Sequence, residues 1–289
     1  MDSILSVNKL ASLLGFKRQV LEDIANQKSK HYHPYSKEEL KKDGTVKIRR
    51  IDNPSAAIKP IQRRINKVLI QPMCDQLPDY MTGSIKGRGI KHNAKPHVAS
   101  EAVLCVDISN CFPSISSSMV YSVFKQQFGC SPPVAKLLAK LTTYGDRLPQ
   151  GAPTSSGLCN LVLLDLSVEL HKLATDNGLA FTQYIDDLTF SGSEELLVKT
   201  KPYILNCVKK HGFKINERKL KLETHKSRME VTGLVVNSKV SVGRKYVREI
   251  ERDILGKKER AVIKGKIAHV SSVSTRLAEM LNKKLKRKG

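Results

Sequence analysis

Three aspartates stand at positions where their carboxylates could hold metal ions. Asp186 and Asp187 are adjacent and lie between two apolar segments, and Asp107 lies at the end of the apolar segment 101–108. Adjacent carboxylates repel each other, so a turn in an apolar hairpin is a costly place for them unless a cation compensates for their charge. If the segments are neighbouring strands of one sheet, the three carboxylates converge at its rim.

Hard oxygen ligands of this kind suit Mg²⁺, which keeps several waters and takes further ligands from substrate phosphates. Two such ions about 3.5–4 Å apart can activate an attacking hydroxyl and neutralise a leaving pyrophosphate. The chemistry that this arrangement predicts is nucleotidyl transfer. The alternative is an ordinary turn without metal, because aspartate tolerates turn backbone angles.

Several segments of the first half show the patterns that must position these residues. The first 30 residues have apolar side chains at near-helical spacing. The basic stretch that follows predicts a hairpin around Asp43-Gly44, and the next segment predicts a helix between Pro60 and Pro72. Residues 101–108 read as a buried strand, followed by helices over 116–128 and 133–143.

The second half continues the mixture. We expect a helix that ends at Gly178, two short strands joined by a turn at Asp186-Asp187, and a helix over about 194–211. A strand pair over 215–237, broken around 223–228, precedes basic helices in the last 45 residues. Strands and helices mix without regular βαβ alternation, so we predict an α+β fold with an antiparallel sheet.

The charge balance indicates an anionic partner. Fifty lysines and arginines stand against 27 aspartates and glutamates, for a formal charge of +23. Such an excess strains a compact fold by self-repulsion, and it favours binding of nucleic acid. No apolar run approaches the roughly 18 residues of a spanning helix, so we expect no membrane partner. The N-terminal segment lacks the pattern of a secretory signal.

The six cysteines show no metal-binding spacing. Cys105, Cys159 and Cys207 lie within apolar or mixed segments, where a free thiol behaves as a small hydrophobe. We expect buried, reduced thiols in a cytoplasmic protein.

Several motifs occur together in an order that resembles the reverse transcriptases. VDISNCFPSI resembles motif A of that family, LPQGAPTSSGLCN motif B, and QYIDDLTFSG the YxDD motif C. GFKINERKLKL is similar to the lysine-bearing motif that follows, MEVTGLVVN to the primer-grip hairpin, and VKIRRIDNPSAAIKPIQRRI to the first fingers motif. The resemblance covers about residues 40–240. Within the family, Asn93-Ala94-Lys95-Pro96-His97 and Val231-Thr232-Gly233 resemble the NAxxH and VTG elements of retron reverse transcriptases.

The resemblance implies a right-hand polymerase fold. Fingers and palm, interleaved, would span residues 1–238, and a short basic helical thumb would span residues 239–289. Asp107, Asp186 and Asp187 would be catalytic and would hold two Mg²⁺ ions, with Mn²⁺ as a substitute. The backbone carbonyl of Ile108 would be an extra ligand.

The same resemblance implies a set of nucleotide-binding residues. Phe112 would be the steric gate against a ribose 2′-hydroxyl, although it could equally serve core packing. Gln150 and Gly151 would lie against the incoming nucleotide. Lys47 and Arg49 would clamp the triphosphate, unless they belong to a solvated basic hairpin. Lys219 would lie near the pyrophosphate as a proton donor.

The RNA-binding residues implied are basic side chains and the two retron elements. They are Arg63, Arg64, Lys86, Arg88, Asn93, His97, Val231, Thr232 and Gly233, together with basic thumb residues (Lys257, Lys258, Arg260, Lys264, Lys266 and 283–288). Three departures from the commonest retron pattern are Ile185 for alanine, Ser156 for proline, and Asn110-Cys111 for an acidic and aromatic pair. None of them removes a metal ligand.

Retron enzymes copy part of their own structured non-coding RNA. They start from the 2′-hydroxyl of an internal guanosine and give a branched RNA–DNA, and retron complexes are associated with phage defence through a separate effector protein. By resemblance we expect the same partners here: the cognate RNA and its RNA–DNA product, deoxynucleoside triphosphates, and an effector. The alternatives are another bacterial reverse transcriptase, of a diversity-generating or defence type, and a non-catalytic RNA-binding scaffold.

Overall fold

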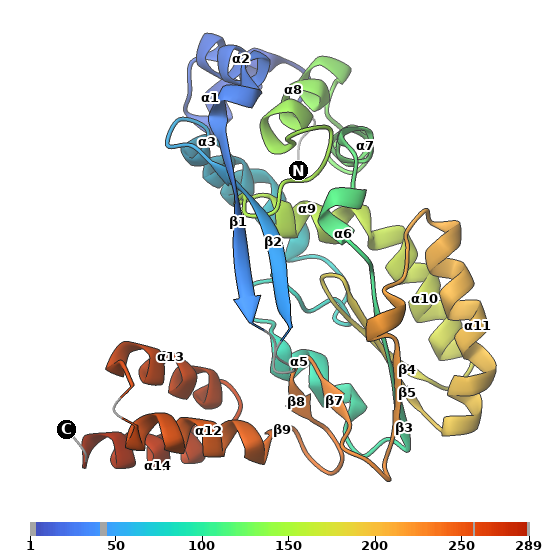
Figure 1. Cartoon of the computed structure of the whole chain (residues 1–289). Coiled ribbons are helices and arrows are strands. Elements are labelled where there is room, and N and C mark those ends of the chain that lie inside the picture. Colours follow the sequence, from blue (N-terminus) through green and yellow to red (C-terminus); the bar gives the residue numbers. More distant parts are fainter. Residues whose placement is uncertain (1–3, 41–44, 257, 288–289) are drawn as a thin grey trace.

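The computed structural model describes residues 4–40, 45–256 and 258–287. Figure 1 shows a helical region at the top, a long β-hairpin running down from it, a sheet covered by long helices, and a separate helical bundle near the C-terminus. The α+β class and the antiparallel sheet predicted from the sequence are confirmed.

The helical region is built from the first and middle parts of the chain. The N-terminal segment forms α1 (Val7–Leu14) and α2 (Arg18–Asn26), separated at Gly15, whose φ of 73° ends α1. Helices α7 (Ser117–Gln126) and α8 (Pro132–Thr142) pack against each other, and α2 packs on α8. The predicted helices of this region are therefore confirmed.

The hairpin pairs β1 (Tyr32–Leu40) with β2 (Val46–Pro54), antiparallel over their whole length. Its expected turn at Asp43-Gly44 lies outside the described residues. After it, α3 (Lys59–Ile65), a π-helical turn η2 (Asn66–Ile70) and α4 (Gln71–Cys74) follow without a gap. The helix predicted between Pro60 and Pro72 is confirmed, and it ends two residues past Pro72, at Cys74.

The central sheet has the strand order β4-β5-β3-β6. Its strands are β3 (Ala102–Asp107), β4 (Ala180–Tyr184), β5 (Asp187–Gly192) and β6 (Lys221–Thr224), and every pairing in it is antiparallel. Helix α10 (Leu164–Asp176) packs on β4, and α11 (Glu194–Lys210) packs on β3 and β5. The strand pair predicted over 215–237 was wrong in its pairing, because β6 joins β3 rather than the segment that follows it.

That following segment forms a small second sheet, β7 (Glu230–Val231), β8 (Leu234–Val235) and β9 (Ser241–Val242). It shares an apolar core with the bundle of α12 (Arg244–Leu255), α13 (Arg260–Ser271) and α14 (Thr275–Lys286). The predicted C-terminal helices are confirmed.

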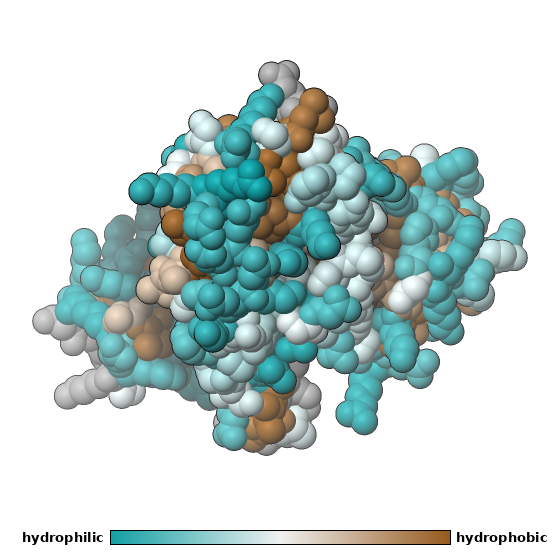
Figure 2. Space-filling model, turned by 90° about the horizontal axis from the view of Figure 1, so that it is seen from above, coloured by the Kyte–Doolittle hydropathy of each residue, from teal (hydrophilic) through white to brown (hydrophobic). Residues whose placement is uncertain are grey.

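Short elements complete the chain. They are η1 (Lys28–His31), α5 (Ile90–Ala94), η3 (Lys95–His97), α6 (Cys111–Ser114), α9 (Ser155–Val162) and η4 (Glu217–Lys219). Across the described ranges, no helix is long and apolar enough to cross a membrane. Seen from above, the surface is mostly hydrophilic, with separate apolar patches (Figure 2).

Candidate active site

The three aspartates converge at one end of the central sheet, as the sequence predicts. Asp107 ends β3 and Asp187 begins β5, and the two are directly opposite each other in the antiparallel register. Asp186 lies in the turn before β5, and its carbonyl accepts a hydrogen bond from the Ile108 N–H at 3.1 Å. Strand pairing and a tight turn therefore bring the carboxylates together.

The turn itself is held in an unusual conformation. Ile185 has a φ of 57°, which is rare for a β-branched residue. Gly83 packs so closely beneath it that a Cβ there would lie 2.5 Å from the Ile185 nitrogen. The Asn160 side chain donates to the Gly83 carbonyl at 2.7 Å, and the Gln183 side chain donates to the Ile185 carbonyl at 2.8 Å. Neighbouring segments thus fix the strained backbone that carries Asp186.

The environment of Asp187 disfavours its charged form. Burial, followed by the nearby charges of Asp186 and Asp107, raises the pKa of Asp187 to about 7. Lys219 donates to one oxygen of Asp107 at 2.5 Å, and Asn216 donates to the other at 3.1 Å. One lysine offsets only part of this concentrated negative charge, so the oxygen donor set fits a divalent cation.

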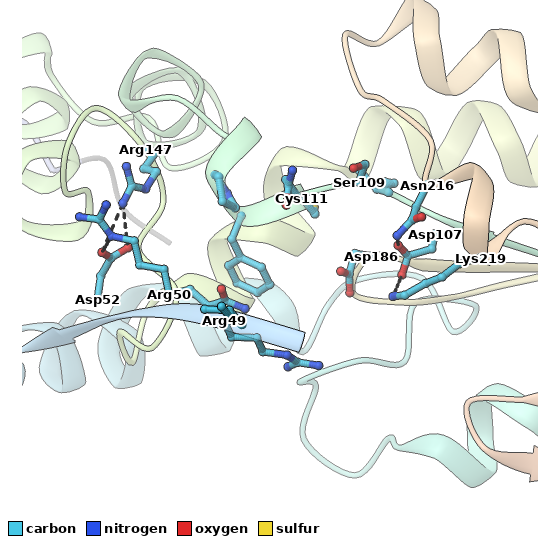
Figure 3. Close-up of a pocket in the computed structure, with 16 residues that line it drawn as sticks. Arg49, Arg50, Asp52, Asp107, Ser109, Cys111, Arg147, Asp186, Asn216 and Lys219 are labelled. Atoms are coloured by element: carbon cyan, nitrogen blue, oxygen red, sulfur yellow. Dashed lines mark hydrogen bonds and ion pairs between the residues drawn. The ribbon is translucent and has the colours of Figure 1, made fainter. Parts of the chain in front are cut away.

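A cleft of about 450 Å³ opens beside these aspartates. It is lined by most of the residues that the sequence indicated for metal and nucleotide binding: Asp107, Ile108, Asp186, Arg49, Phe112, Gln150 and Lys219. Figure 3 shows the arginines of the hairpin on one side of the cleft and the carboxylates with Lys219 on the other. The cleft therefore has a cationic wall facing an anionic wall.

The residues predicted to bind the nucleotide differ in their contacts around this cleft. Arg49 pairs with Glu39 at 2.9 Å across the hairpin. Phe112 lines the cleft and also packs on the core, so its two expected roles are compatible. Gly151 has a φ of 119°, and a Cβ there would lie 3.0 Å from the Ile51 side chain, so a glycine is needed for this close approach. The side chain of Lys47 lies outside the described part of the structure.

The structure adds an ion-pair cluster that the sequence reasoning missed. Asp52, whose side chain is 3% exposed, lies 3.3 Å from both the Arg147 and the Arg50 guanidinium groups (Figure 3). The Asp52 N–H also donates to the carbonyl of Gln150 at 2.8 Å. This cluster joins β2 to the loop that carries Gln150. The available signal was an aspartate within a basic strand, directly after two arginines and an isoleucine.

A smaller hollow of about 240 Å³ lies on the other side of Asp107. Asp187, Thr232 and Gly233 line it together with Lys219. Thr232 and Gly233 both have positive φ values, 46° and 80°, in the turn between β7 and β8. Two residues of the predicted VTG element therefore lie beside the aspartates, whereas Val231 is buried in the core of the bundle.

Asn93 and His97 of the NAKPH element, both predicted to contact RNA, are fully buried, whereas Lys95 of the same element is exposed. His97 bonds Ser191 and Thr182, both at 2.7 Å, and burial lowers its pKa to about 4. Asn93 accepts from Thr82 at 2.9 Å. With Val231, these side chains have no surface to offer a ligand. We assign them instead to joining the central sheet to the segment before it and to the small second sheet.

The predicted basic residues also divide into exposed residues and residues whose charge is used within the protein. Arg63, Arg64 and Lys86 are exposed, although Arg64 also donates to the carbonyl of Leu13 at 3.4 Å. Arg88 donates to the carbonyls of Pro78 and Met81 at 2.6 and 2.9 Å, so it stabilises a loop rather than offering its charge.

The basic residues of the bundle divide in the same way. Lys266 lies 2.5 Å from both Glu249 and Asp253, which ties α13 to α12. Arg260 and Lys264 are exposed. Lys257 and Lys288 lie outside the described residues.

Comparison with known proteins agrees with this geometry. The family model described as "Reverse transcriptase (RNA-dependent DNA polymerase)" matches residues 40–236. The retron Se72 reverse transcriptase of Salmonella heidelberg is 32% identical over 258 residues, covering 85% of this chain and 66% of that protein. The retron Ec86 reverse transcriptase of Escherichia coli is 32% identical over 216 residues, covering 74% of this chain and 67% of that protein. The chain thus spans about two thirds of the length of these relatives.

Among solved structures, telomerase from Candida albicans, in complex with a fragment of telomeric RNA, superposes with a TM-score of 0.52. The match covers 93% of this chain and 60% of that one, at 10% sequence identity. At that identity the likeness shows the fold alone, and that fold is the right-hand polymerase architecture.

Proposed function

The chain belongs to the reverse transcriptase family and resembles its retron members, and from this premise we propose that it is the RNA-directed DNA polymerase of a retron. In this proposal residues 1–238 form the fingers and palm, and residues 239–289 form the thumb. The relatives' retron assignment supports this choice over the other bacterial reverse transcriptases.

One observation carries the catalytic part of the proposal. Asp107 and Asp186 line the same cleft as Arg49 and Gln150, although these residues come from distant parts of the chain. A non-catalytic scaffold has no physical need for clustered carboxylates, which repel one another in the folded state. The arrangement is the one that nucleotidyl transfer requires.

Reverse transcriptases generally use divalent metal ions, and the oxygen donors here fit such ions. We assign Asp107, Asp186 and Asp187, with the Ile108 carbonyl, to holding two Mg²⁺ ions, for which Mn²⁺ can substitute. When bound, these ions supply activation of the primer hydroxyl and neutralisation of the leaving pyrophosphate.

The other residues bind and orient the nucleotide. Arg49 and Lys47 of the hairpin contact the triphosphate, where a guanidinium can donate two parallel hydrogen bonds to phosphate oxygens. Gln150 and Gly151 lie against the incoming nucleotide, and the Phe112 ring excludes a ribose 2′-hydroxyl. Lys219, which is half exposed beside Asp107, donates a proton to the leaving pyrophosphate.

The RNA partner follows from charge and from the retron relatives. Arg63, Arg64 and Lys86 are exposed cations that can contact phosphates, as are Arg260 and Lys264 in the thumb. Neutralising 6–10 phosphates makes binding fall by roughly 10³–10⁵ between 50 and 200 mM salt. We propose that the cognate non-coding RNA is held in this way, and that an internal guanosine 2′-hydroxyl primes synthesis of a branched RNA–DNA. We propose further that the product acts in phage defence with an effector protein.

Co-expression of the protein with the DNA upstream of its gene tests this function. Total nucleic acid would be run on a denaturing gel, beside an Asp186→Ala/Asp187→Ala control. We expect a discrete small single-stranded DNA that is fully released only after debranching and is absent from the control.

If no such DNA appears, the purified protein is given Mg²⁺, deoxynucleotides and a primed RNA template. Extension there would keep the polymerase and remove the retron assignment. The absence of both products would leave an RNA-binding scaffold.

A further inference from the structure

Two buried cysteines face each other beside the nucleotide cleft. Cys111 begins α6, directly before Phe112, and Cys159 lies within α9. Their Sγ atoms are 3.4 Å apart, and the two side chains are 2% and 0% exposed. A disulfide has an S–S length of about 2.05 Å, so the sulfur atoms need to approach by only about 1.3 Å to form one.

The two thiols connect two segments that build the cleft. Cys111 follows Asp107 by four residues in the first motif and itself lines the cleft, and Cys159 belongs to the helix that follows Gln150 and Gly151. Helices α6 and α9 pack against each other, so the pair is held in place by the fold. A bond between the sulfurs would therefore act directly on the nucleotide site.

We propose that Cys111 and Cys159 form an oxidisable site, at which a peroxide creates a disulfide that suppresses nucleotide addition. This inference rests on the proposed polymerase function. Cys111 lines the cleft and so meets the oxidant first, whereas Cys159 lies behind it.

The chemistry is the usual two-step formation of a disulfide. The Cys111 sulfur attacks one peroxide oxygen, the O–O bond breaks, and a sulfenic acid and one water result. The Cys159 sulfur then attacks the Cys111 sulfur, the S–O bond breaks, and a second water leaves. The two thiols lose two electrons and two protons, and the peroxide is reduced to two waters. A thiol reductant reverses the change by exchange.

The bond would reposition the residue next to Cys111. Drawing α6 towards α9 moves the Phe112 ring, which lines the cleft. A displacement of about 1 Å in a reacting site can cost about 10²-fold in rate. We therefore expect about a 10²-fold loss of nucleotide addition on oxidation.

The test uses the full chain in its reduced form. Primer extension on an RNA template is measured before hydrogen peroxide treatment, after treatment and catalase, and again after dithiothreitol. Proteolytic mapping by mass spectrometry follows the link between the peptides of Cys111 and Cys159. We expect the linked peptide to appear as activity falls and to disappear as activity returns. The absence of the linked peptide, or a linked protein of full activity, would overturn the inference.

Matched variants make the result specific, each compared with its own untreated sample. Cys159→Ala removes the partner thiol. We therefore expect that peroxide treatment of this variant causes no loss of activity that dithiothreitol then reverses. Cys130→Ala removes another buried thiol that does not line the cleft, and we expect it to respond like the wild type. The central comparison is between reduced, oxidised and re-reduced samples of the wild type. It therefore does not depend on how well either variant folds.

The outcome is separable from that of the proposed function. If the reduced protein extends no primer, the polymerase assignment fails. The thiol site is then decided by the linked peptide and by calorimetry of deoxynucleotide binding before and after oxidation, where unchanged binding to the linked protein would refute it.

Discussion

Replacing Asp52 by alanine tests whether the buried ion-pair cluster holds the hairpin in its working position. The substitution removes the carboxylate shared by Arg147 and Arg50 and leaves the Asp52 backbone bond to Gln150 in place. Removing one partner of a fully buried ion pair costs about 3–5 kcal/mol. Arg147 is 26% exposed and Arg50 is 59% exposed, so water can solvate both once they are unpaired. We therefore expect a loss of about 2–3 kcal/mol.

Thermal unfolding measures this loss. A loss of that size lowers Tm by about 2 °C per kcal/mol in a chain of this length, or about 4–6 °C in all. The control is Asp79→Ala, which removes a carboxylate paired with Arg88 at 3.0 Å but fully exposed, so its Tm should not change measurably. Arg147→Ala and the double variant complete a cycle, and coupling of the two residues makes the double variant less destabilised than the sum.

The same substitution should impair catalysis. With the hairpin less firmly joined to the loop of Gln150, Arg49, which we propose binds the triphosphate, moves relative to the aspartates, and KM for deoxynucleotides should rise about tenfold. An Asp52→Ala protein with the Tm of the control and an unchanged KM would refute this reasoning. Strict additivity in the cycle would also show that Asp52 and Arg147 act independently.

Three further predictions follow from the geometry of the site. The pKa of Asp187 is raised in the folded protein, so the native state binds more protons than the unfolded chain between about pH 4 and 7. The free energy of unfolding therefore falls with rising pH over that window, by up to about 1.4 kcal/mol per pH unit. Asp187→Asn should abolish polymerase activity and yet raise Tm at pH 8 in the presence of a chelator; an unchanged or lower Tm there would contradict the repulsion. Because the pKa of His97 is lowered, the native state binds fewer protons between about pH 4 and 6.5, and stability rises with pH over that window. His97→Ala should weaken that rise and lower the free energy of unfolding at pH 7, as urea unfolding across the pH range can check. Phe112→Ala should raise the use of ribonucleotides relative to deoxynucleotides by at least about tenfold in single-nucleotide extension, and an unchanged ratio would leave Phe112 only its packing role.

Much of the site could be predicted because its motifs are local. The adjacency of Asp186 and Asp187 within an apolar hairpin, and the position of Asp107 at a strand end, already contain the geometry that places them together. A single antiparallel pairing turns these local patterns into a cluster. The glycine at position 151 likewise indicates that another segment lies close to the backbone there, and in the structure this is the Ile51 side chain.

The ion-pair cluster could not be predicted because it depends on distant contacts. Asp52 and Arg147 are 95 positions apart, and only the packed hairpin brings them together. The pairing of β6 with β3 is also long-range, and local strand patterns do not select between such partners.

The retron elements show a different difficulty. Asn93 and His97 were assigned to RNA contact through the resemblance to the NAxxH element, which does not reveal how far a side chain is buried. Their hydrogen-bond partners Thr182 and Thr82 lie on other segments, and the fold uses them to satisfy buried polar groups. The resemblance to the retron elements therefore indicated contact with RNA, whereas the structure buries both side chains.

Extension of a DNA primer on an RNA template by the purified chain, with Mg²⁺ and deoxynucleotides, tests the central claim most directly. The matched control is Asp186→Asn, which keeps the size of the side chain and removes its charge. We expect the wild type to extend the primer to the end of the template, and the variant to bind the duplex but add no nucleotide. A wild type that binds the duplex without extension, or a variant that extends it as well as the wild type, would contradict the assignment of these carboxylates to polymerisation.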